Sequence, residues 1–94
     1  MTEITPSEQI VPCQDIAPVQ MSAERRTLDK APHQSSFATF SDWAHHEARR
    51  MCDRGSCVTG TCRGYVDVSE WRLVEENETA FTCEFSAEFY CRCH

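Results

Sequence analysis

The sequence has no long apolar run, no recognisable export signal and no internal repeat. No stretch approaches the roughly eighteen consecutive apolar residues typical of a membrane-spanning helix. The first twenty residues carry Glu3, Glu8 and Asp15 and lack a basic start followed by an apolar run, which is the pattern of a secretory signal. We therefore expect no membrane span and a cytoplasmic location.

The chain is also short of residues that fill a hydrophobic core. It has 94 residues, of which 40% are hydrophobic, and that fraction includes seven cysteines. A core of this size gives marginal stability, so small domains commonly add disulfides or a metal ion. In a reducing cytosol, clustered cysteines are more often metal ligands, and an odd number cannot all pair within one chain. We therefore favour a metal over disulfides or unligated thiols.

Positive charge is scarce where the sequence has its strongest structural pattern. The net charge is −6, and residues 65–94 contain two arginines against seven acidic residues. Proteins that bind nucleic acid usually concentrate basic residues on one surface, and this distribution counts against a DNA-binding zinc finger. The alternative is nucleic-acid binding through the arginines that gather just upstream, namely Arg49, Arg50, Arg54 and Arg63.

The spacing of prolines and apolar residues predicts two parts. Residues 1–36 contain four prolines among polar residues and only isolated large apolar residues, which predicts a flexible, disordered arm. The region 41–53 predicts a helix, with Ser41 as its cap and arginines near its end. Its apolar stripe has helical spacing and comprises Phe40, Trp43, Ala44, Ala48 and Met51. Residues 37–94 would then form the folded, cysteine-rich domain.

The carboxy-terminal region predicts a β-hairpin. From Phe81 to Cys93 every odd position is apolar or a thiol, and no even position is aliphatic. This period of two predicts a half-buried strand, with a bend near Ser86 and Ala87 because the strand is long. The predicted strands are residues 63–74 and 79–93, joined by an acidic turn. The predicted fold is a small, metal-stabilised α+β domain in which the helix packs on this antiparallel hairpin.

The hairpin brings cysteines together at its open end. Depending on the register, Cys62 faces either Cys91 or Cys93, and the helix end and the following loop supply two more thiols. We predict one structural Zn²⁺, because a d10 ion accepts tetrahedral thiolate coordination. Its four ligands would come from Cys52, Cys57, Cys62, Cys91 and Cys93. The alternatives are a disulfide of the Cys62–Cys91 type or ordinary buried thiols.

The remaining cysteines and the histidines have simpler interpretations. Cys83 lies too far along the strand to join the metal site and is expected in the core. Cys13 lies in the arm and is expected to be a free thiol. His45 and His46 are adjacent, so they cannot both face one metal from a helix, and we expect both in solvent. His94 is a weaker candidate to replace one cysteine ligand.

Function is less sharply indicated than structure. No motif fixes a nucleophile beside a base, so we expect no enzyme. We predict a non-enzymatic, zinc-binding protein-interaction module, an adaptor, regulator or inhibitor of the type that phages and mobile elements encode. It would bind a protein partner through the acidic hairpin and the arm. The alternatives are the arginine-based nucleic-acid binder and a thiol-based redox switch.

Overall fold

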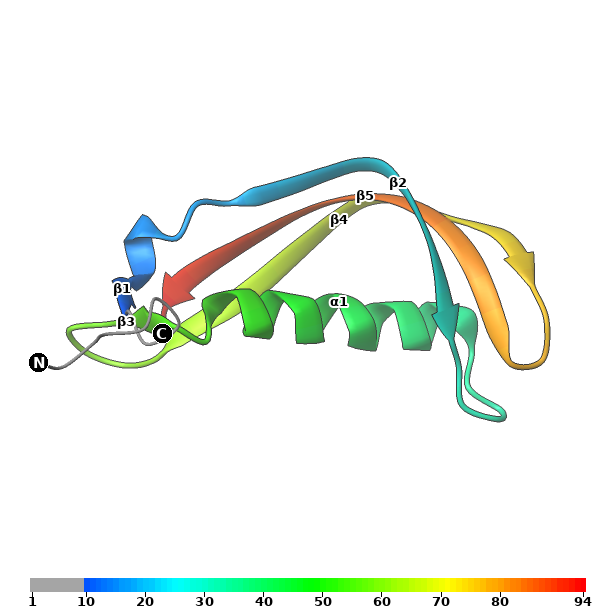
Figure 1. Cartoon of the computed structure of the whole chain (residues 1–94), viewed down its shortest axis with the longest axis horizontal. Helices are drawn as coiled ribbons and strands as arrows, with labels where there is room; N and C mark the ends of the chain where they lie inside the picture. The colour runs from blue at the N-terminus through cyan, green and yellow to red at the C-terminus, as the bar shows by residue number, and fades with distance from the viewer. Residues whose placement is uncertain (1–9) are drawn as a thin grey trace, which may run out of the picture.

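The computed structural model describes residues 10–94, which form a curved three-stranded sheet with one long helix on its concave face (Figure 1). The chain begins with a short strand β1 (Val11–Pro12) and a 3-10 turn η2 (Cys13–Asp15). Strand β2 (Val19–Asp29) leads to helix α1 (Ser36–Cys52). A short strand β3 (Gly55–Ser56) precedes the hairpin of β4 (Cys62–Glu76) and β5 (Ala80–Cys93). This is a small α+β fold with one α-helix and an antiparallel sheet.

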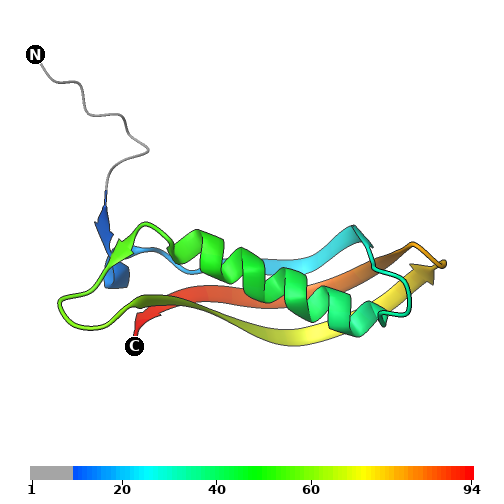
Figure 2. The same ribbon diagram turned by 90° about the horizontal axis from the view of Figure 1, so that it is seen from below.

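Strand β5 is the centre of the sheet. The order is β2-β5-β4, and both neighbours run antiparallel to β5. The outer strands β2 and β4 are therefore parallel to each other, and α1 connects them while β5 occupies the place between (Figure 2). This is a split βαβ arrangement. Strands β1 and β3 form a separate parallel pair, with Val11 opposite Gly55.

The predicted alternation of β5 is confirmed over most of its length. Every odd residue from Phe81 to Phe89 is buried, and every even residue from Thr82 to Tyr90 is only partly buried. The odd residues face α1, and the core cluster joins them to Phe40, Ala44 and Ala48 of the helix. The alternation stops at the carboxy end, where Cys93 is exposed.

The sheet bends at Ser86, as expected, but the extra residues lie on the partner strands. The register shifts between Met21 and Glu24 in β2, and between Val68 and Glu70 in β4, both opposite Ser86. Ser86 stabilises both irregularities. Its hydroxyl accepts a hydrogen bond from the backbone N–H of Ala23 at 3.0 Å, and its carbonyl accepts one from the Ser69 hydroxyl at 3.2 Å. Bulges increase local twist and bend strands, which explains the arch over α1 (Figure 1).

Helix α1 begins five residues earlier than predicted. Ser35, rather than Ser41, is its cap, and the Ser35 hydroxyl accepts a hydrogen bond from the N–H of Ala38 at 3.1 Å. The buried face follows a strict spacing of four residues, and it consists of Ser36, Phe40, Ala44, Ala48 and Cys52. Arg49 and Arg50 lie in the last turn, where positive charge is favourable. None of the helices in residues 10–94 combines the length and apolar character that a membrane crossing requires.

Small residues let α1 approach β4 closely. A Cβ atom added at Gly64 would lie against the carbonyl group of Ala48, nearer than real Cβ atoms come. The contact is backbone against backbone, so no side chain can rotate away. Glycine at position 64 and alanine at position 48 therefore set the distance between the helix and the strand at this end.

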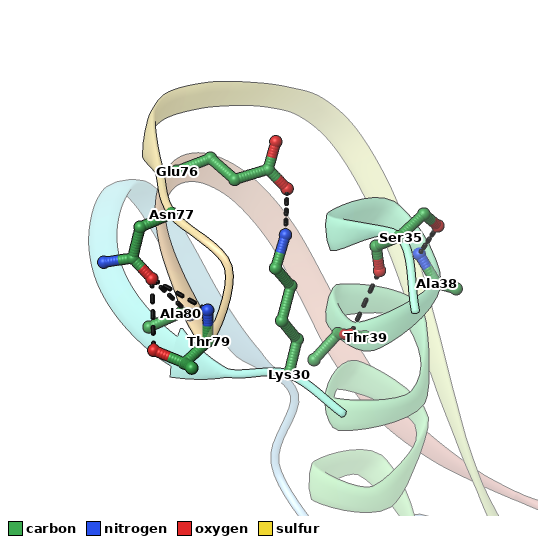
Figure 3. A network of polar contacts seen from close by, with 8 residues as sticks. All are labelled: Lys30, Ser35, Ala38, Thr39, Glu76, Asn77, Thr79 and Ala80. Atoms are coloured by element: carbon green, nitrogen blue, oxygen red, sulfur yellow. Dashed lines mark hydrogen bonds and ion pairs between the residues drawn. The ribbon is translucent and has the colours of Figure 1, made fainter. Parts of the chain in front are cut away.

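A polar network fixes the opposite end of the molecule (Figure 3). The Asn77 side-chain oxygen accepts hydrogen bonds from the backbone N–H groups of Thr79 and Ala80, both at 2.9 Å, which closes the β4–β5 turn. Lys30 follows β2 and donates through its Nζ atom to Glu76. The backbone N–H of Lys30 also donates to the carbonyl of Thr79. These contacts fasten the end of β2 to the hairpin tip.

The prediction of a flexible arm over residues 1–36 is wrong for much of that segment. Residues Val19–Asp29 form β2, and the folded domain therefore begins well before residue 37. Only three β2 side chains are partly buried, namely Met21, Glu24 and Leu28. The strand is held mainly by its backbone pairing with β5, which a polar sequence can form as well as an apolar one. The part of the predicted arm at residues 1–9 lies outside the described residues.

Candidate functional site, the cysteine cluster

Six of the seven cysteines meet at one end of the molecule. They come from η2, the last residue of α1, the loop after β3, the start of β4 and the end of β5. Figure 1 shows these elements together at the end opposite the β4–β5 turn. We call this group the cysteine cluster, and its members are Cys13, Cys52, Cys57, Cys62, Cys91 and Cys93.

The cluster is joined as three disulfides. Cys13 pairs with Cys62, with 5.6 Å between their Cα atoms. Cys52 pairs with Cys91 and Cys57 pairs with Cys93, each with 5.8 Å between the Cα atoms. These distances fall within the usual range for disulfides. The bonds connect α1, β4 and the segment before β2 to the rest of the fold, where the hydrophobic core does not extend.

One of the two predicted hairpin registers occurs, but it does not set the bonding. Cys62 lies directly opposite Cys93 in the sheet. Each of these residues nevertheless bonds to a cysteine from outside the hairpin, Cys13 and Cys57 respectively. The considered Cys62–Cys91 disulfide is therefore wrong, because Cys91 bonds to the end of the helix at Cys52.

The prediction that Cys13 is a free thiol in a disordered arm is also wrong. Cys13 is completely buried and bonded to Cys62. The β1–β3 pair brings it there, since the N–H of Val11 donates to the carbonyl of Arg54 at 3.1 Å. Gly55 contributes by its lack of a side chain, because an added Cβ would collide with the side chain of Cys62. The signal available in the sequence was the even number of cysteines that remains once Cys83 is assigned to the core.

The sulfurs form two groups whose geometry would also suit a metal ion. The Sγ atoms of Cys13, Cys57 and Cys93 all lie within 4.8 Å of one another, and so do those of Cys52, Cys62 and Cys91. Both groups contain residues predicted as zinc ligands, and the first adds Cys13. Zinc binds thiolates, however, and these six sulfurs are oxidised in the structure. A metal could occupy these groups only after reduction.

Cys83 lies outside the cluster, as predicted. It is completely buried on the central strand and is a free thiol in the core beneath α1. Burial raises the pKa of the Cys83 thiol above its ordinary value. This thiol therefore stays protonated at neutral pH and has the properties of a small apolar residue.

The four arginines of the nucleic-acid alternative do not form one surface. Arg49 and Arg63 line a pocket between α1 and β4, together with His45 and Tyr65. Arg50 and Arg54 line a second pocket on the β2 side of the helix, together with Met51 and Phe89. The helix thus lies between the two pairs.

The histidines offer no metal site in the described chain. His45 and His46 are both exposed, as expected, and the ring Nδ1 of His45 lies 2.7 Å from the carbonyl oxygen of Ser41. The backbone of His94 exchanges two hydrogen bonds with Thr61, at 2.9 and 3.0 Å, which continues the hairpin past Cys93.

The shifted acidic groups are explained by their neighbours. Glu84 on β5 contacts Arg72 at 3.0 Å and Arg25 at 3.5 Å, and a hydrogen bond from Arg72 is the main cause of the lowered pKa of its carboxyl. Lys30 lowers the pKa of Glu76 through its hydrogen bond. Partial desolvation is the main cause of the raised pKa of Tyr90, which stacks on Tyr65. All three are structural ion pairs or packing effects.

An exposed apolar surface lies on the helix side of β4. Val68, Trp71 and Leu73 are opposite buried β5 residues, so they point to the same face of the sheet as the core. The Phe37 ring of α1 packs edge-on against Trp71, with 5.3 Å between the centroids. Phe37 is nevertheless 58% exposed, and Val68 and Leu73 are 42% and 38% exposed. We call these four residues the apolar strip.

Acidic side chains lie on the same hairpin as the apolar strip, but two of them point to the other face of the sheet. Glu70 and Glu75 are opposite Ser86 and Thr82, which face away from α1. Glu70 and Glu75 lie on β4, and Glu78 lies in the adjoining turn, and all three are exposed. Within residues 10–94 none of the three takes part in an ion pair. These carboxylates, along the edge strand β4 and its turn, are therefore available to a partner.

Comparison with known proteins identifies no relative. No protein-family model matches the chain, and no curated protein or solved structure matches it either.

Proposed function

We propose that this chain is a small, non-enzymatic protein-interaction module, acting as an adaptor, regulator or inhibitor. Its partner binds the apolar strip and the acidic residues of the β4–β5 hairpin. The observation that carries the proposal is the exposure of Phe37 beside Trp71, on a strand that carries two further exposed apolar side chains. Aromatic side chains that remain accessible on a rigid framework are typical anchors of protein interfaces.

The charge of the hairpin that carries the strip indicates the chemistry of the partner. Glu70, Glu75 and Glu78 have no cationic partner among the described residues, so they favour a basic protein surface. The partner would insert an apolar side chain against Phe37 and Leu73 and place lysines or arginines along the outer edge of β4. The interface is held on a helix and a strand, so little ordering is needed on binding.

Disulfides suggest where the module functions. Three disulfides persist in oxidising compartments and are rare in a reducing cytosol. We therefore propose an oxidising environment in place of the cytoplasmic location expected from the sequence. Zinc is the competing proposal for the same sulfurs, and it applies to the reduced chain, in which the two groups of three thiols would be free to bind metal.

The test compares partner capture by the oxidised wild type with capture by matched surface variants. Phe37→Ser and Leu73→Ser alter the apolar strip, while Val58→Ser is the control, because Val58 is fully exposed in the loop between β3 and β4. Support consists of one protein that the wild type and Val58→Ser capture equally and that both strip variants bind about tenfold more weakly, as loss of an anchor predicts.

Two outcomes would contradict the proposal. One is a partner whose capture neither strip variant changes. The other is tight binding of nucleic acid with a steep decrease in affinity as salt rises, which would instead support the arginine pockets.

A further inference from the structure

The three disulfides lie close enough together for thiol–disulfide exchange among them. Cys13 and Cys62 belong to different groups of three sulfurs, and the bond between them links the two groups. The sulfur of Cys13 lies within 4.8 Å of both sulfurs of the Cys57–Cys93 bond. The sulfur of Cys62 lies equally close to both sulfurs of the Cys52–Cys91 bond. The bond between Cys13 and Cys62 is therefore in the middle of a row.

Solvent access is greatest at one end of that row. Cys93 is exposed and Cys57 is partly buried, so an external thiol can reach their bond. Cys13 and Cys52 are buried, so neither of the other bonds exposes both sulfurs. Exchange requires a thiolate to reach a sulfur of the target bond. For Cys13, the neighbouring sulfurs of Cys57 and Cys93 are much better placed than any solvent thiol.

We propose that the cysteine cluster is a thiol–disulfide relay, in which the Cys57–Cys93 bond accepts reducing equivalents from an external dithiol and passes them inward. The relay is independent of the proposed partner surface, which lies on another part of the fold. The reductant is a small-molecule or protein dithiol, which ends as a disulfide.

Each step of the relay exchanges one bond for another. A thiolate of the dithiol attacks Cys93, forms a mixed disulfide and releases Cys57 as a thiolate. The second thiol of the reductant then attacks its own sulfur in that mixed disulfide, so the reductant leaves as a disulfide and Cys93 leaves as a thiol. The Cys57 thiolate attacks Cys13, which forms a Cys13–Cys57 bond and releases Cys62. Cys62 attacks Cys52 or Cys91 and releases the other as a thiolate, which takes up a proton.

The balance is two electrons and two protons, transferred from the dithiol to the chain. Three disulfides are present at the start, and two are present at the end. The two thiols of the product are Cys93 and either Cys52 or Cys91. The end of α1 loses its native link to β5 in this product, since Cys52 and Cys91 no longer bond to each other.

The first test supplies the attacking thiol by mutation. Cys93→Ser leaves Cys57 unpaired beside the intact Cys13–Cys62 bond, at an exposed position near the chain end where serine disturbs little packing. After incubation at pH 8, acid quenching and labelling with N-ethylmaleimide, peptide mapping locates the free thiols. Of the N-ethylmaleimide bound to cysteines of the cluster, we expect at least about a tenth on Cys62, Cys52 or Cys91. We also expect a Cys13–Cys57 disulfide. Label confined to Cys57 would overturn the relay.

Two further samples make the result decisive. The double variant Cys57→Ser/Cys93→Ser has no attacking thiol in the cluster and should keep both remaining native bonds, and scrambling in this control would also refute the proposal. If Cys93→Ser does not fold, wild type treated with one equivalent of dithiothreitol gives the answer. The relay then predicts thiols at Cys93 and at Cys52 or Cys91, whereas thiols at Cys57 and Cys93 alone would contradict it.

Discussion

Removing the Cys52–Cys91 bond should cost less stability when the Cys57–Cys93 bond is present than when it is absent. Without the other crosslinks, Cys52–Cys91 closes a loop with a sequence separation of 39 residues, which corresponds to about 4 kcal/mol in the chain-entropy treatment. With Cys57–Cys93 intact, the shortest path from Cys52 to Cys91 runs through that bond and includes only about seven residues. The same treatment then gives about 2.5 kcal/mol.

The two bonds should therefore be coupled. Cys57–Cys93 has a similar separation of 36 residues, so its removal alone should also cost about 2.5 kcal/mol. Removing both should cost about 6.5 kcal/mol, roughly 1.5 kcal/mol more than the two single losses together. A total of that size is comparable to the whole stability of a small domain, so the doubly depleted chain should be close to unfolding at room temperature.

The assay is guanidinium unfolding followed by tryptophan fluorescence, since Trp43 and Trp71 both contact the core. Cysteines are replaced by alanine in pairs, because a single unpaired thiol in the cluster would attack its neighbours. The four chains needed are the wild type, each paired variant and the combination. Equal losses of about 4 kcal/mol for each bond in either background, or losses below about 1 kcal/mol, would refute the reasoning about connected loops.

Three further predictions follow from the fold. Gly64→Ala should destabilise the chain by about 1–3 kcal/mol, since the new methyl group collides with the backbone of Ala48, and unfolding that matches wild type would show that helix and strand are not in close contact. Ser86→Ala should cost about 1 kcal/mol by leaving the N–H of Ala23 without its acceptor, measurable as faster hydrogen exchange at Ala23 and absent if the bend has another cause. The ion pairs of Glu84 lower its folded-state pKa, so their stabilising contribution is complete above the ordinary value of 4.5 and is lost as pH falls below it. Glu84→Gln should therefore lose less stability than wild type between pH 7 and pH 3 in urea unfolding, and equal losses would argue against the Arg72 contact.

The elements that could be predicted are those in which the pattern of apolar and polar side chains follows their burial. Strand β5 is buried on one face along most of its length, so its alternation appears directly in the sequence. The apolar stripe predicts the helix but not its first turn, because Ser36 and Phe37 contribute little to that pattern. The sequence does not predict strand β2, because few of its side chains reach the core and because it has a bulge at Ala23, whose φ is +49°.

The predicted alignment of Cys62 with Cys93 occurs in the hairpin, but for a different reason from the one predicted. Cys62 lies opposite Cys93, as one of the predicted turns required. The actual turn is longer, with Glu76 opposite Phe81, and two shifts in β4 then restore the alignment at the open end. Sequence spacing could not reveal these bulges, since they depend on how the sheet bends over α1.

The bonding of the cysteines depends on tertiary contacts and was therefore the least predictable feature. Cys13 reaches the cluster only because β1 pairs with β3, two elements of two residues each. Such short elements leave no periodic signal. Without that contact, the five carboxy-terminal cysteines resemble a metal site, and the presence of a sixth is what permits complete pairing.

Tryptic mapping of the unreduced chain tests the disulfide pattern most directly. Cleavage after arginine places Cys52 in residues 51–54, Cys91 in residues 73–92 and Cys93 in residues 93–94, while residues 55–63 carry both Cys57 and Cys62. The structure predicts one linked pair, 51–54 with 73–92, and one linked trio, 1–25 with 55–63 and 93–94. Intact protein that carries one zinc and seven free thiols, or a link between residues 55–63 and 73–92, would contradict it.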